Sequence, residues 1–465
     1  MTDFAPLLAV DRGQKSRLIH LVDKDGFEAW LKKRSPEDRS LIEAQRFDGK
    51  SPFASVILPR GGDFEVVSAV KKADRLSPWC LAKLAETLPA GTYKLAEGDP
   101  GQAALGWLLA QHRFDDFRSK KEQTDEGPLL LLTPDAASVD ATVRLAQATA
   151  LVRDLVNTPA GDLGPAELEQ AVRKAATDLG AKVQVTSGEE LSRGYPLIAA
   201  VGRAASEARA PRLIELEWGK PDDPRVAIVG KGVCFDSGGL DLKPASGMRL
   251  MKKDMGGAAH ALALARLVIG AKLPVHLHLL IPAVENAVSA DAFRPGDIIR
   301  SRQGLFVEID NTDAEGRLIL ADALTKAAED KAELIVDFAT LTGAARVALG
   351  PDLPAFFSND DDLAAEAAAA SAEAEDPLWR MPLWDAYDEL LKSDVADIAN
   401  AANSPMAGSI VAAMFLKRFV PDGVKWAHFD TYSWRDAAKP GRPKGGEALG
   451  LRTMFTLLNK RYLQS

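Results

Sequence analysis

Two short stretches of the chain concentrate charged side chains of the kinds that bind metal ions. The first, VAIVGKGVCFDSGGLDLKPASGMRLMKKDMGGAAH, runs from Val226 to His260, and the second, FVEIDNTDAEGRL, runs from Phe306 to Leu318. The candidate side chains are four carboxylates, two lysines and one arginine, namely Asp236, Asp254, Asp313, Glu315, Lys231, Lys243 and Arg317. Three carboxylates from the two stretches would suffice to hold one metal ion, and four could hold two.

The elements around these residues place them near strand ends. Val226–Val229 is an apolar, β-branched run with the length of a buried strand, and a glycine follows it. We therefore expect Lys231 and the residues after it to lie in a loop at the carboxyl end of a strand, where doubly wound α/β sheets bind their ligands. The second stretch is typical of a strand and a loop. An extended loop would place Asp313, Glu315 and Arg317 on one side, because side chains alternate along an extended chain.

Three of the charged residues also have a structural interpretation. Asp254 could cap the alanine-rich helix that follows it, and Thr312 with Glu315 has the spacing of a capping box ahead of a helix over residues 318–328. Lys231 lies between two glycines and could belong to a phosphate-binding loop, but neither the P-loop pattern nor the dinucleotide fingerprint is met. No capping argument explains the whole set, because so much like charge is costly unless cations neutralise it.

The donor types leave the identity of the metal open. Oxygen-rich sites suit Mg²⁺ or Mn²⁺, whereas a neutral lysine amine favours Zn²⁺, and a neighbouring dication can keep such an amine deprotonated. We expect no histidine or cysteine ligand. The residues for which we expect structural positions are His20, His112, His260, His276, His278 and His428.

The order of the predicted elements favours an α/β protein of two domains. Strands are predicted at residues 18–22, 54–58, 129–132, 183–186, 197–201, 213–218, 226–229, 275–281, 334–338 and 425–429, and helices at 82–88, 102–111, 137–156, 256–269 and 318–328. Alternating strands and helices indicate a mixed, largely parallel sheet flanked by helices in the larger domain. We expect a smaller N-terminal α/β domain over 1–136, a linking helix over 137–156, and the larger domain over 157–465.

Two charged segments are expected to be solvent-exposed. Residues 118–126 are predicted to form a loop, and the acidic, alanine-rich run 360–375 is predicted to be a solvated helix face or loop. The net charge of −9 argues against non-specific binding of nucleic acid or anionic membranes. The two cysteines have no metal or redox spacing, and we find neither a signal peptide nor an apolar run of about 18 residues. We therefore expect a cytoplasmic protein.

Several blocks together resemble the leucyl aminopeptidase family, the cytosolic di-metal aminopeptidases. These blocks are VGKGVCFDSGGLDLKP, MKKDMGGAA, NTDAEGRL, ATLTGA at Ala339–Ala344 and LVNTPAGDLGP at Leu155–Pro165. The resemblance spans roughly residues 150 to 435. It implies that Lys231, Asp236, Asp254 and Glu315 hold a tightly bound metal, and that Asp236, Asp313 and Glu315 hold an exchangeable one. The ions would be Zn²⁺ or Mn²⁺, with Mg²⁺ or Co²⁺ as alternatives.

The resemblance also implies an activity. A metal-bridged hydroxide would release the N-terminal residue of a peptide, with Lys243 stabilising the oxyanion and Arg317 holding a bicarbonate that shuttles the proton. Met251, Thr340, Leu341 and Gly343 match positions that line the substrate cleft. A leucine or another apolar first residue would be preferred, although PGRPKGGEALGLR at Pro440–Arg452 departs from the better-known members near the first-residue pocket. The implied assembly is a homohexamer of two trimers.

Two alternatives remain open at this point. A DNA-binding or regulatory protein could use the same scaffold, although the acidic balance counts against it. A two-metal phosphoesterase uses similar carboxylate clusters but gives no reason for a lysine at the metal.

Overall fold

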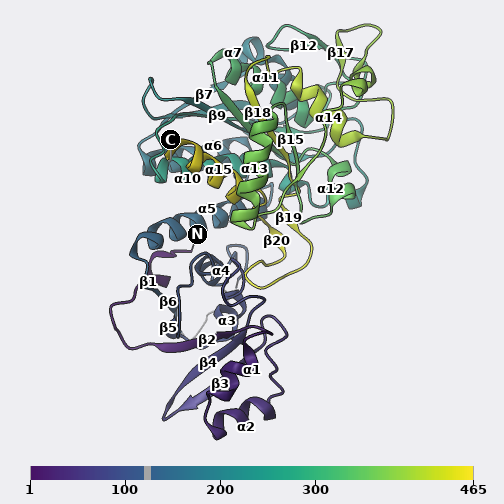
Figure 1. The fold of residues 1–465 in the computed structure, drawn as a ribbon. Helices are drawn as coiled ribbons and strands as arrows, with labels where there is room; N and C mark the ends of the chain where they lie inside the picture. The colour runs from purple at the N-terminus through teal and green to yellow at the C-terminus, as the bar shows by residue number, and fades with distance from the viewer. Residues whose placement is uncertain (1, 120–126, 464–465) are drawn as a thin grey trace. The chain divides into compact units, whose positions relative to one another are not determined.

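The computed structural model describes residues 2–119 and 127–463, so most of the charged segment 118–126 lies outside the described residues. The chain forms two compact units (Figure 1). Unit 1 comprises Met1–Ala150 and Ala437–Lys444, and unit 2 comprises Leu151–Asp436 and Gly445–Ser465. The helix expected between the domains is α5 (Ala136–Asn157), and the boundary between the units falls within it.

Unit 1 contains a six-stranded sheet in the order β1-β6-β5-β2-β4-β3. Its strands are β1 (Leu8–Val10), β2 (Arg17–Val22), β3 (Ser55–Arg60), β4 (Asp63–Ala69), β5 (Gly91–Leu95) and β6 (Leu129–Thr133). All neighbouring pairs are parallel except β3 and β4. Its helices are α1 (Phe27–Lys32), α2 (Pro36–Ala44), α3 (Ala82–Thr87) and α4 (Ala103–Leu109), and the core around α3, α4 and the sheet includes the fully buried Tyr93 and Trp107.

Unit 2 contains a nine-stranded sheet in the order β16-β15-β18-β14-β9-β11-β8-β7, with β10 also pairing with β11. The strands are β7 (Lys182–Ser187), β8 (Arg212–Trp218), β9 (Arg225–Gly230), β10 (Gly232–Asp236), β11 (His276–Asn286), β14 (Leu334–Ala339), β15 (Ala355–Ser358), β16 (Trp379–Arg380) and β18 (Lys425–Asp430). The neighbours β18, β14, β9 and β11 run parallel, whereas β7, β8 and β15 pair antiparallel. The expected α/β class with a mixed, largely parallel sheet is confirmed.

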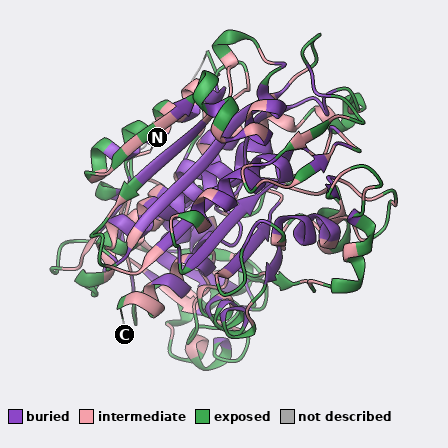
Figure 2. Cartoon of the chain, turned by 90° about the horizontal axis from the view of Figure 1, so that it is seen from above, coloured by how far each residue is buried: buried purple, intermediate pink, exposed green. Residues whose placement is uncertain are grey.

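Helices cover both faces of the central strands, which are therefore buried on both sides (Figure 2). Ala227 and Val229 belong to a core cluster with α8 (Pro196–Gly202), α11 (Glu315–Glu329) and α14 (Gly408–Lys417). Val226 and Ile228 alternate with them and so point to the opposite face, on which α10 (Gly256–Gly270) packs against β9 and β14. Helices α6 (Pro165–Leu179) and α15 (Leu451–Leu463) contact α10, and α13 (Asp361–Ala374) packs on α15.

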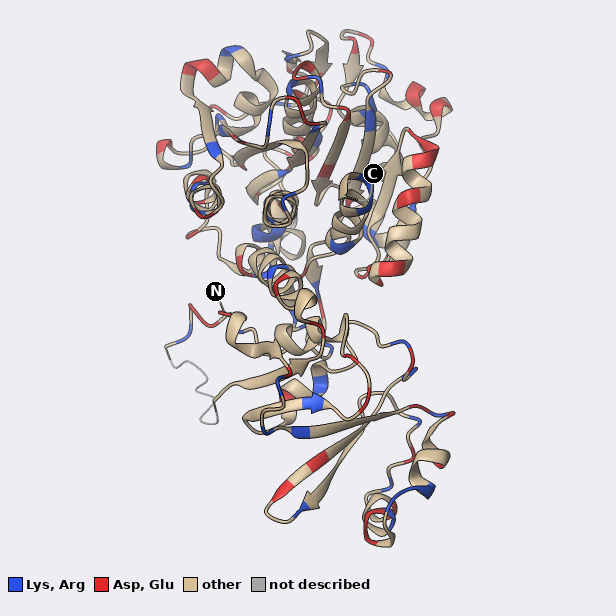
Figure 3. Cartoon of the chain, turned by 60° about the vertical axis from the view of Figure 1, so that its left-hand side comes forward, with Lys and Arg blue, Asp and Glu red and all other residues tan. Residues whose placement is uncertain are grey.

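Short elements complete unit 2. They are α7 (Gly188–Gly194), α9 (Ala245–Met248), α12 (Gly343–Leu349), β12 (Ile298–Arg300), β13 (Phe306–Glu308), β17 (Ile398–Ala399), β19 (Trp434–Arg435), β20 (Gly445–Gly446) and the 3-10 helices η2 (Glu207–Arg209), η3 (Met251–Met255) and η4 (Asp385–Leu391). The acidic run that we expected to be a solvated helix face or loop is helix α13, with Leu363 and Ala367 buried and its acids largely outward. In Figure 3, Lys and Arg residues are interspersed with Asp and Glu.

Two local predictions were wrong. The strand predicted at 197–201 is helix α8, because a short apolar run does not distinguish a strand from a buried helix, and Pro196 at its first position favours a helix. The loop predicted after Gly230 is limited to Lys231, since β10 follows directly and pairs with β11. That pairing depends on a distant strand and is not visible in the local pattern.

Both cysteines, Cys80 and Cys234, are buried, and neither forms a disulfide within the described residues. Across the part of the chain that the structure describes, no helix combines the length and the apolar character needed to span a membrane.

Candidate functional site

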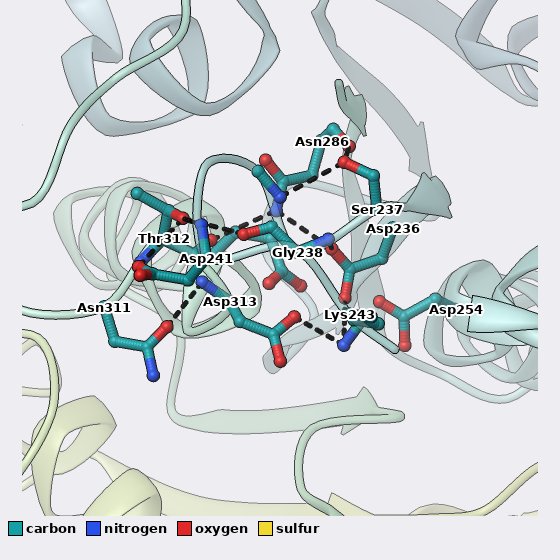
Figure 4. Close-up of polar contacts among 12 residues, drawn as sticks. Asp236, Ser237, Gly238, Asp241, Lys243, Asp254, Asn286, Asn311, Thr312 and Asp313 are labelled. Carbon is teal, nitrogen blue, oxygen red and sulfur yellow. Dashed lines mark hydrogen bonds and ion pairs between the residues drawn. The ribbon is translucent and has the colours of Figure 1, made fainter. Parts of the chain in front are cut away.

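The charged residues of the two stretches converge at the carboxyl ends of the parallel strands of unit 2. Figure 4 shows four of them, Asp236, Lys243, Asp254 and Asp313. Lys231 lies between β9 and β10, where its backbone N–H donates to Phe338 and its carbonyl accepts from Ala258, so that β14 and α10 both hold it. Asp236 is the last residue of β10, and Asp254 lies in η3. The site therefore occupies the edge where α/β sheets place their ligands.

The second stretch reaches this edge in a different way from the one predicted. Glu315 is the first residue of α11 and Arg317 lies in its first turn, while Asp313 precedes the helix, so the three side chains do not belong to one extended loop. The capping interpretations are also wrong. The N-cap of α11 is Ala314 and that of α10 is Met255, and neither helix has a side-chain cap.

Three buried carboxylates form the centre of the site. Asp236, Asp254 and Glu315 each offer one oxygen, and these atoms all lie within 4.8 Å of one another. Lys231 Nζ lies 2.7 Å from Asp254 Oδ2 and 3.0 Å from Glu315 Oε1, and it donates to the Thr340 carbonyl at 3.1 Å. Residues of β10, η3 and α11, together with Lys231 after β9 and Thr340 after β14, thus surround one small volume.

Lys243 joins the fourth carboxylate to this centre. Its Nζ lies 2.8 Å from Asp236 Oδ2 and also contacts Asp313 Oδ1 (Figure 4). Lys243 is mostly buried and Asp313 is partly exposed. All four predicted carboxylates and both predicted lysines are therefore brought together.

The pKa values of these groups reflect an excess of acid. Burial, followed by the nearby Asp236 and Asp254 charges, raises the pKa of Glu315 to about 8, although Lys231 opposes the shift. Burial and Asp236 raise the pKa of Asp313 to about 6. Burial disfavours the charged form of both lysines, but the surrounding carboxylates outweigh it and raise the pKa of Lys231 and of Lys243. The two lysines alone do not neutralise this cluster.

The residues fit divalent cations. Glu315 Oε2 is buried and has no hydrogen-bond partner among the described residues, so one acceptor of the cluster is left for a cation or a proton. Four carboxylates and a lysine amine are oxygen and nitrogen donors that Mn²⁺, Mg²⁺ and Zn²⁺ accept. A glycine beside the centre leaves space for the Lys231 side chain. A Cβ on Gly316 would lie 2.5 Å from Lys231 Cε, so only glycine lets that lysine reach the acids.

A set of polar residues that the sequence analysis did not single out positions the carboxylates. Asn286, at the end of β11, donates to Asp236 Oδ1 at 2.9 Å and to the Thr312 carbonyl at 3.1 Å. The N–H of Gly238, a residue with φ of 88° that favours glycine, donates to the same Asp236 oxygen at 2.8 Å. Asp241 Oδ2 accepts from the Thr312 N–H at 2.7 Å. An amide at the end of a long, mostly apolar strand was the available signal for Asn286.

Arg317 is buried beside this network. Its Nη1 donates to the Asn400 carbonyl at 2.7 Å, and its Nε has no hydrogen-bond partner among the described residues. Burial lowers the pKa of Arg317 to about 10, against the opposing effect of Glu315 and Asp430, so the group is cationic at neutral pH. Arg317 can therefore offer a charged fork to an anion.

The charged centre opens into a cleft of about 500 Å³. The residues predicted to line the substrate cleft, Met251, Thr340, Leu341 and Gly343, all lie in its wall. Thr340 Oγ1 also donates to Asp254 Oδ1 at 2.7 Å. Lys253, Arg346 and Tyr432 line the same cleft without having been predicted, and burial lowers the pKa of Lys253 to about 8.

Comparison with known proteins assigns the family. Residues 150–455 match the catalytic domain of the cytosol aminopeptidase family, and residues 18–131 match the N-terminal domain of M17 aminopeptidases. The chain belongs to the cytosol aminopeptidase family. The resemblance to leucyl aminopeptidases is thereby confirmed, and the protein is a metalloexopeptidase of this type rather than a phosphoesterase.

Individual members of the cytosol aminopeptidase family are similar over most of the chain. A probable cytosol aminopeptidase of Syntrophotalea carbinolica is 45% identical over 371 residues, which cover 76% of this chain and 74% of that protein. The crystal structure of the Coxiella burnetii cytosol aminopeptidase has a TM-score of 0.92 at 43% identity and covers 98% of this chain and 99% of that chain. The bottromycin maturation enzyme BotP in complex with Mn has a TM-score of 0.86 at 32% identity, covering 96% and 100%.

Proposed function

We propose that this aminopeptidase removes the first residue of peptides with two divalent cations held by five side chains. Lys231, Asp236, Asp254 and Glu315 would hold the tightly bound ion, and Asp236, Asp313 and Glu315 the exchangeable one. The observation that carries the proposal is the meeting of Asp236, Asp254 and Glu315 oxygens within 4.8 Å at the base of the cleft. When bound, such cations would supply Lewis-acid chemistry, which lowers the pKa of water and polarises a peptide carbonyl.

Lys243 is the group placed to stabilise negative charge on the reacting carbonyl oxygen. Its ammonium is mostly buried in the cleft wall and keeps its proton, because the carboxylates around it raise its pKa. A fixed charge in a poorly solvated site stabilises a developing oxyanion without reorganisation. Lys243 would leave its contacts with Asp236 and Asp313 once cations neutralise those acids.

Arg317 would hold a bicarbonate with its guanidinium fork. The Nε atom, which has no hydrogen-bond partner in the described part of the chain, and the cationic state at neutral pH support this role. A bicarbonate held by Arg317 would supply proton-transfer chemistry beside the carboxylate centre. No histidine base is required.

The cleft wall supports a preference for leucine or another apolar first residue. Met251 and Leu341 supply apolar side chains, while Thr340 and Gly343 complete the wall. Zn²⁺ and Mn²⁺ are the cations we propose first, with Mg²⁺ or Co²⁺ as alternatives. The Mn bound by the similar BotP supports manganese.

Two kinds of variant test the proposal. Asp236→Asn and Glu315→Gln should each abolish release of a chromogenic amine from leucine p-nitroanilide, with little change in the circular dichroism spectrum. Lys243→Ala should lower kcat while metal content, measured by mass spectrometry, stays at that of the unaltered protein. Near-normal turnover in either carboxylate variant would refute the metal assignment. Loss of metal in Lys243→Ala would show that Lys243 contributes to metal binding instead of catalysis.

We further propose a cytoplasmic homohexamer built from two trimers, which acts on peptides and does not bind nucleic acid. The names of the relatives support the location, and the family resemblance supports the assembly. Light scattering of the metal-loaded protein tests the assembly, and a monomer at micromolar concentration would overturn it. Gel shifts at increasing salt test whether the protein binds nucleic acid, because binding driven by phosphate contacts weakens steeply with salt.

A further inference from the structure

Two cations in the cleft have no part in the proposed chemistry. Lys253 Nζ lies 5.2 Å from the centroid of the Tyr432 ring, and Arg346 Cζ lies 5.0 Å from the same centroid. All three residues line the cleft that contains the carboxylate centre. Lys253 lies next to Asp254 in η3, and Arg346 lies in α12, whose first residue is Gly343. One aromatic ring thus gathers two positive charges beside an otherwise acidic site.

Within the described residues, Lys253 is buried without an anion of its own. Its exposed fraction is 5%, and among the described residues its ammonium makes neither a hydrogen bond nor an ion pair within 4.0 Å. Burying an ammonium is costly unless a partner compensates it. The ring of Tyr432 supplies only part of that compensation, because a cation over an aromatic face gains less than one that is paired with a carboxylate.

The carboxylates nearest to Lys253 are already engaged. Asp254 accepts from Lys231 and from Thr340 Oγ1. Asp430 accepts from the N–H groups of Leu341 and Thr342 at 3.0 and 3.1 Å and from Thr342 Oγ1 at 2.5 Å. In the described chain Arg346 likewise pairs with no acid within 4.0 Å and contacts Tyr432 instead. The positive charge of the pair therefore remains available to a ligand in the cleft.

We propose that Lys253 and Arg346 anchor a carboxylate of the substrate, in addition to the first-residue contacts. This inference rests on the proposed aminopeptidase function, because peptides are the ligands that enter this cleft. A peptide offers a carboxylate from two sources, which are the side chain of an acidic first residue and the terminal carboxylate of a short peptide. With this anchor of Lys253 and Arg346, the enzyme would hydrolyse acidic or very short peptides in preference to longer neutral ones.

Paired substrates on the metal-loaded enzyme separate the two sources. Comparing glutamate p-nitroanilide with leucine p-nitroanilide tests recognition of an acidic first residue. Comparing Leu-Gly with Leu-Gly-amide tests recognition of the terminal carboxylate. In each pair the measured quantity is the ratio of kcat/KM for the charged to the neutral substrate. Lys253→Met and Arg346→Met should each lower, by about tenfold, the ratio for the substrate pair whose carboxylate the two cations bind. A tenfold change is the scale of a lost charged hydrogen bond.

Two further variants make the test specific. Lys253→Arg keeps the charge and should restore most of the ratio. Lys252→Met is the matched control, because Lys252 is the neighbouring lysine and lies over the Trp434 ring rather than in the cleft wall. Both ratios should stay unchanged in that control.

The results distinguish failure of the anchor from failure of the function. Ratios that remain the same in Lys253→Met and Arg346→Met, while leucine p-nitroanilide is still hydrolysed by the unaltered enzyme, overturn the anchor alone. Equal losses on charged and neutral substrates also overturn it, because they indicate a structural role. No hydrolysis of any substrate by the unaltered, metal-loaded enzyme overturns the proposed function itself.

Discussion

The side-chain amide of Asn286 donates to Asp236 Oδ1 at 2.9 Å and also to the carbonyl of Thr312 at 3.1 Å. One residue at the end of β11 thereby connects the two charged stretches, which are far apart in the sequence. With the Gly238 N–H on the same oxygen, Asp236 Oδ1 is fully engaged and Oδ2 is the oxygen that meets Lys243 (Figure 4). Asn286 therefore orients a carboxylate that we assign to both cations.

Replacing Asn286 with alanine should weaken metal binding. Outer partners of a ligating carboxylate are typically worth about 10- to 100-fold in metal affinity, and we expect a loss in that range for the more weakly held ion. Competition with a chromogenic chelator measures the change, and the far-ultraviolet circular dichroism spectrum serves as the control for folding. An affinity equal to that of the unaltered protein would show that Asp236 keeps its orientation without this amide.

Removing divalent ions should abolish peptide hydrolysis and leave the fold intact. Lys231 and Lys243 pair with the acids of the centre, so the cluster retains internal counter-charges without metal. Dialysis against a chelator followed by near-ultraviolet circular dichroism should give a native spectrum, and added Mn²⁺ or Zn²⁺ should restore activity and raise the melting temperature. Unfolding on chelation, or unchanged hydrolysis, would contradict this expectation.

The buried pair Arg153–Glu447 should be critical for the stability of unit 2. Arg153 Nε and Nη2 lie 3.2 and 3.1 Å from Glu447 Oε1, and both residues are at most 2% exposed. Glu447→Ala leaves a buried guanidinium uncompensated, which costs about 3–5 kcal/mol. Urea denaturation of the metal-free protein measures the loss. The matched control is Lys392→Ala, which removes an exposed pair with Glu389 and should change stability by at most ~1 kcal/mol. Similar losses of stability in both variants would argue against a critical role for the Arg153–Glu447 pair.

The contribution of His278 to stability should depend on pH. Its Nε2 lies 3.1 Å from Glu215 Oε1 and its Nδ1 lies 3.3 Å from Asp330 Oδ2. Burial opposes charge on the ring, but the two carboxylates outweigh it and raise the pKa of His278. A raised folded-state pKa means that the stabilisation is complete below the unfolded value of about 6.5 and is lost as the pH rises through the folded value.

His278→Leu should therefore lower the denaturation midpoint more at pH 5.5 than at pH 9. Asp330 behaves in the opposite sense: despite burial, His278 and Lys326 lower its pKa to about 2, so its contribution is present above about pH 4 and declines only as the pH falls towards 2. Asp330 consequently stays ionised across the tested range and does not mask the histidine. An equal loss at both pH values would show that His278 acts by packing alone.

The sequence alone was sufficient for the types and spacing of the reactive groups. The acids, the two lysines and Arg317 stand in short blocks whose composition already indicated metal chemistry and a family, and the apolar run of β9 marked the strand that leads into the site. These features are local, because a buried parallel strand requires a continuous apolar run and a metal centre requires particular donor atoms. The α/β class follows from the same local patterns.

The tertiary structure alone decided how those groups meet. Glu315 reaches the centre as the first residue of α11 and not from an extended loop, and β10 forms because β11 pairs with it. The roles of Asn286 and Lys253 depend on which distant residues lie beside them, and neither residue type nor local spacing specifies that. Hydrogen bonds, burial and ion pairs between segments many residues apart arise only when the sheet brings strand ends together. For this reason the ligand types could be predicted from sequence. The residues that orient them, such as Asn286, and the two cations Lys253 and Arg346 in the cleft could not.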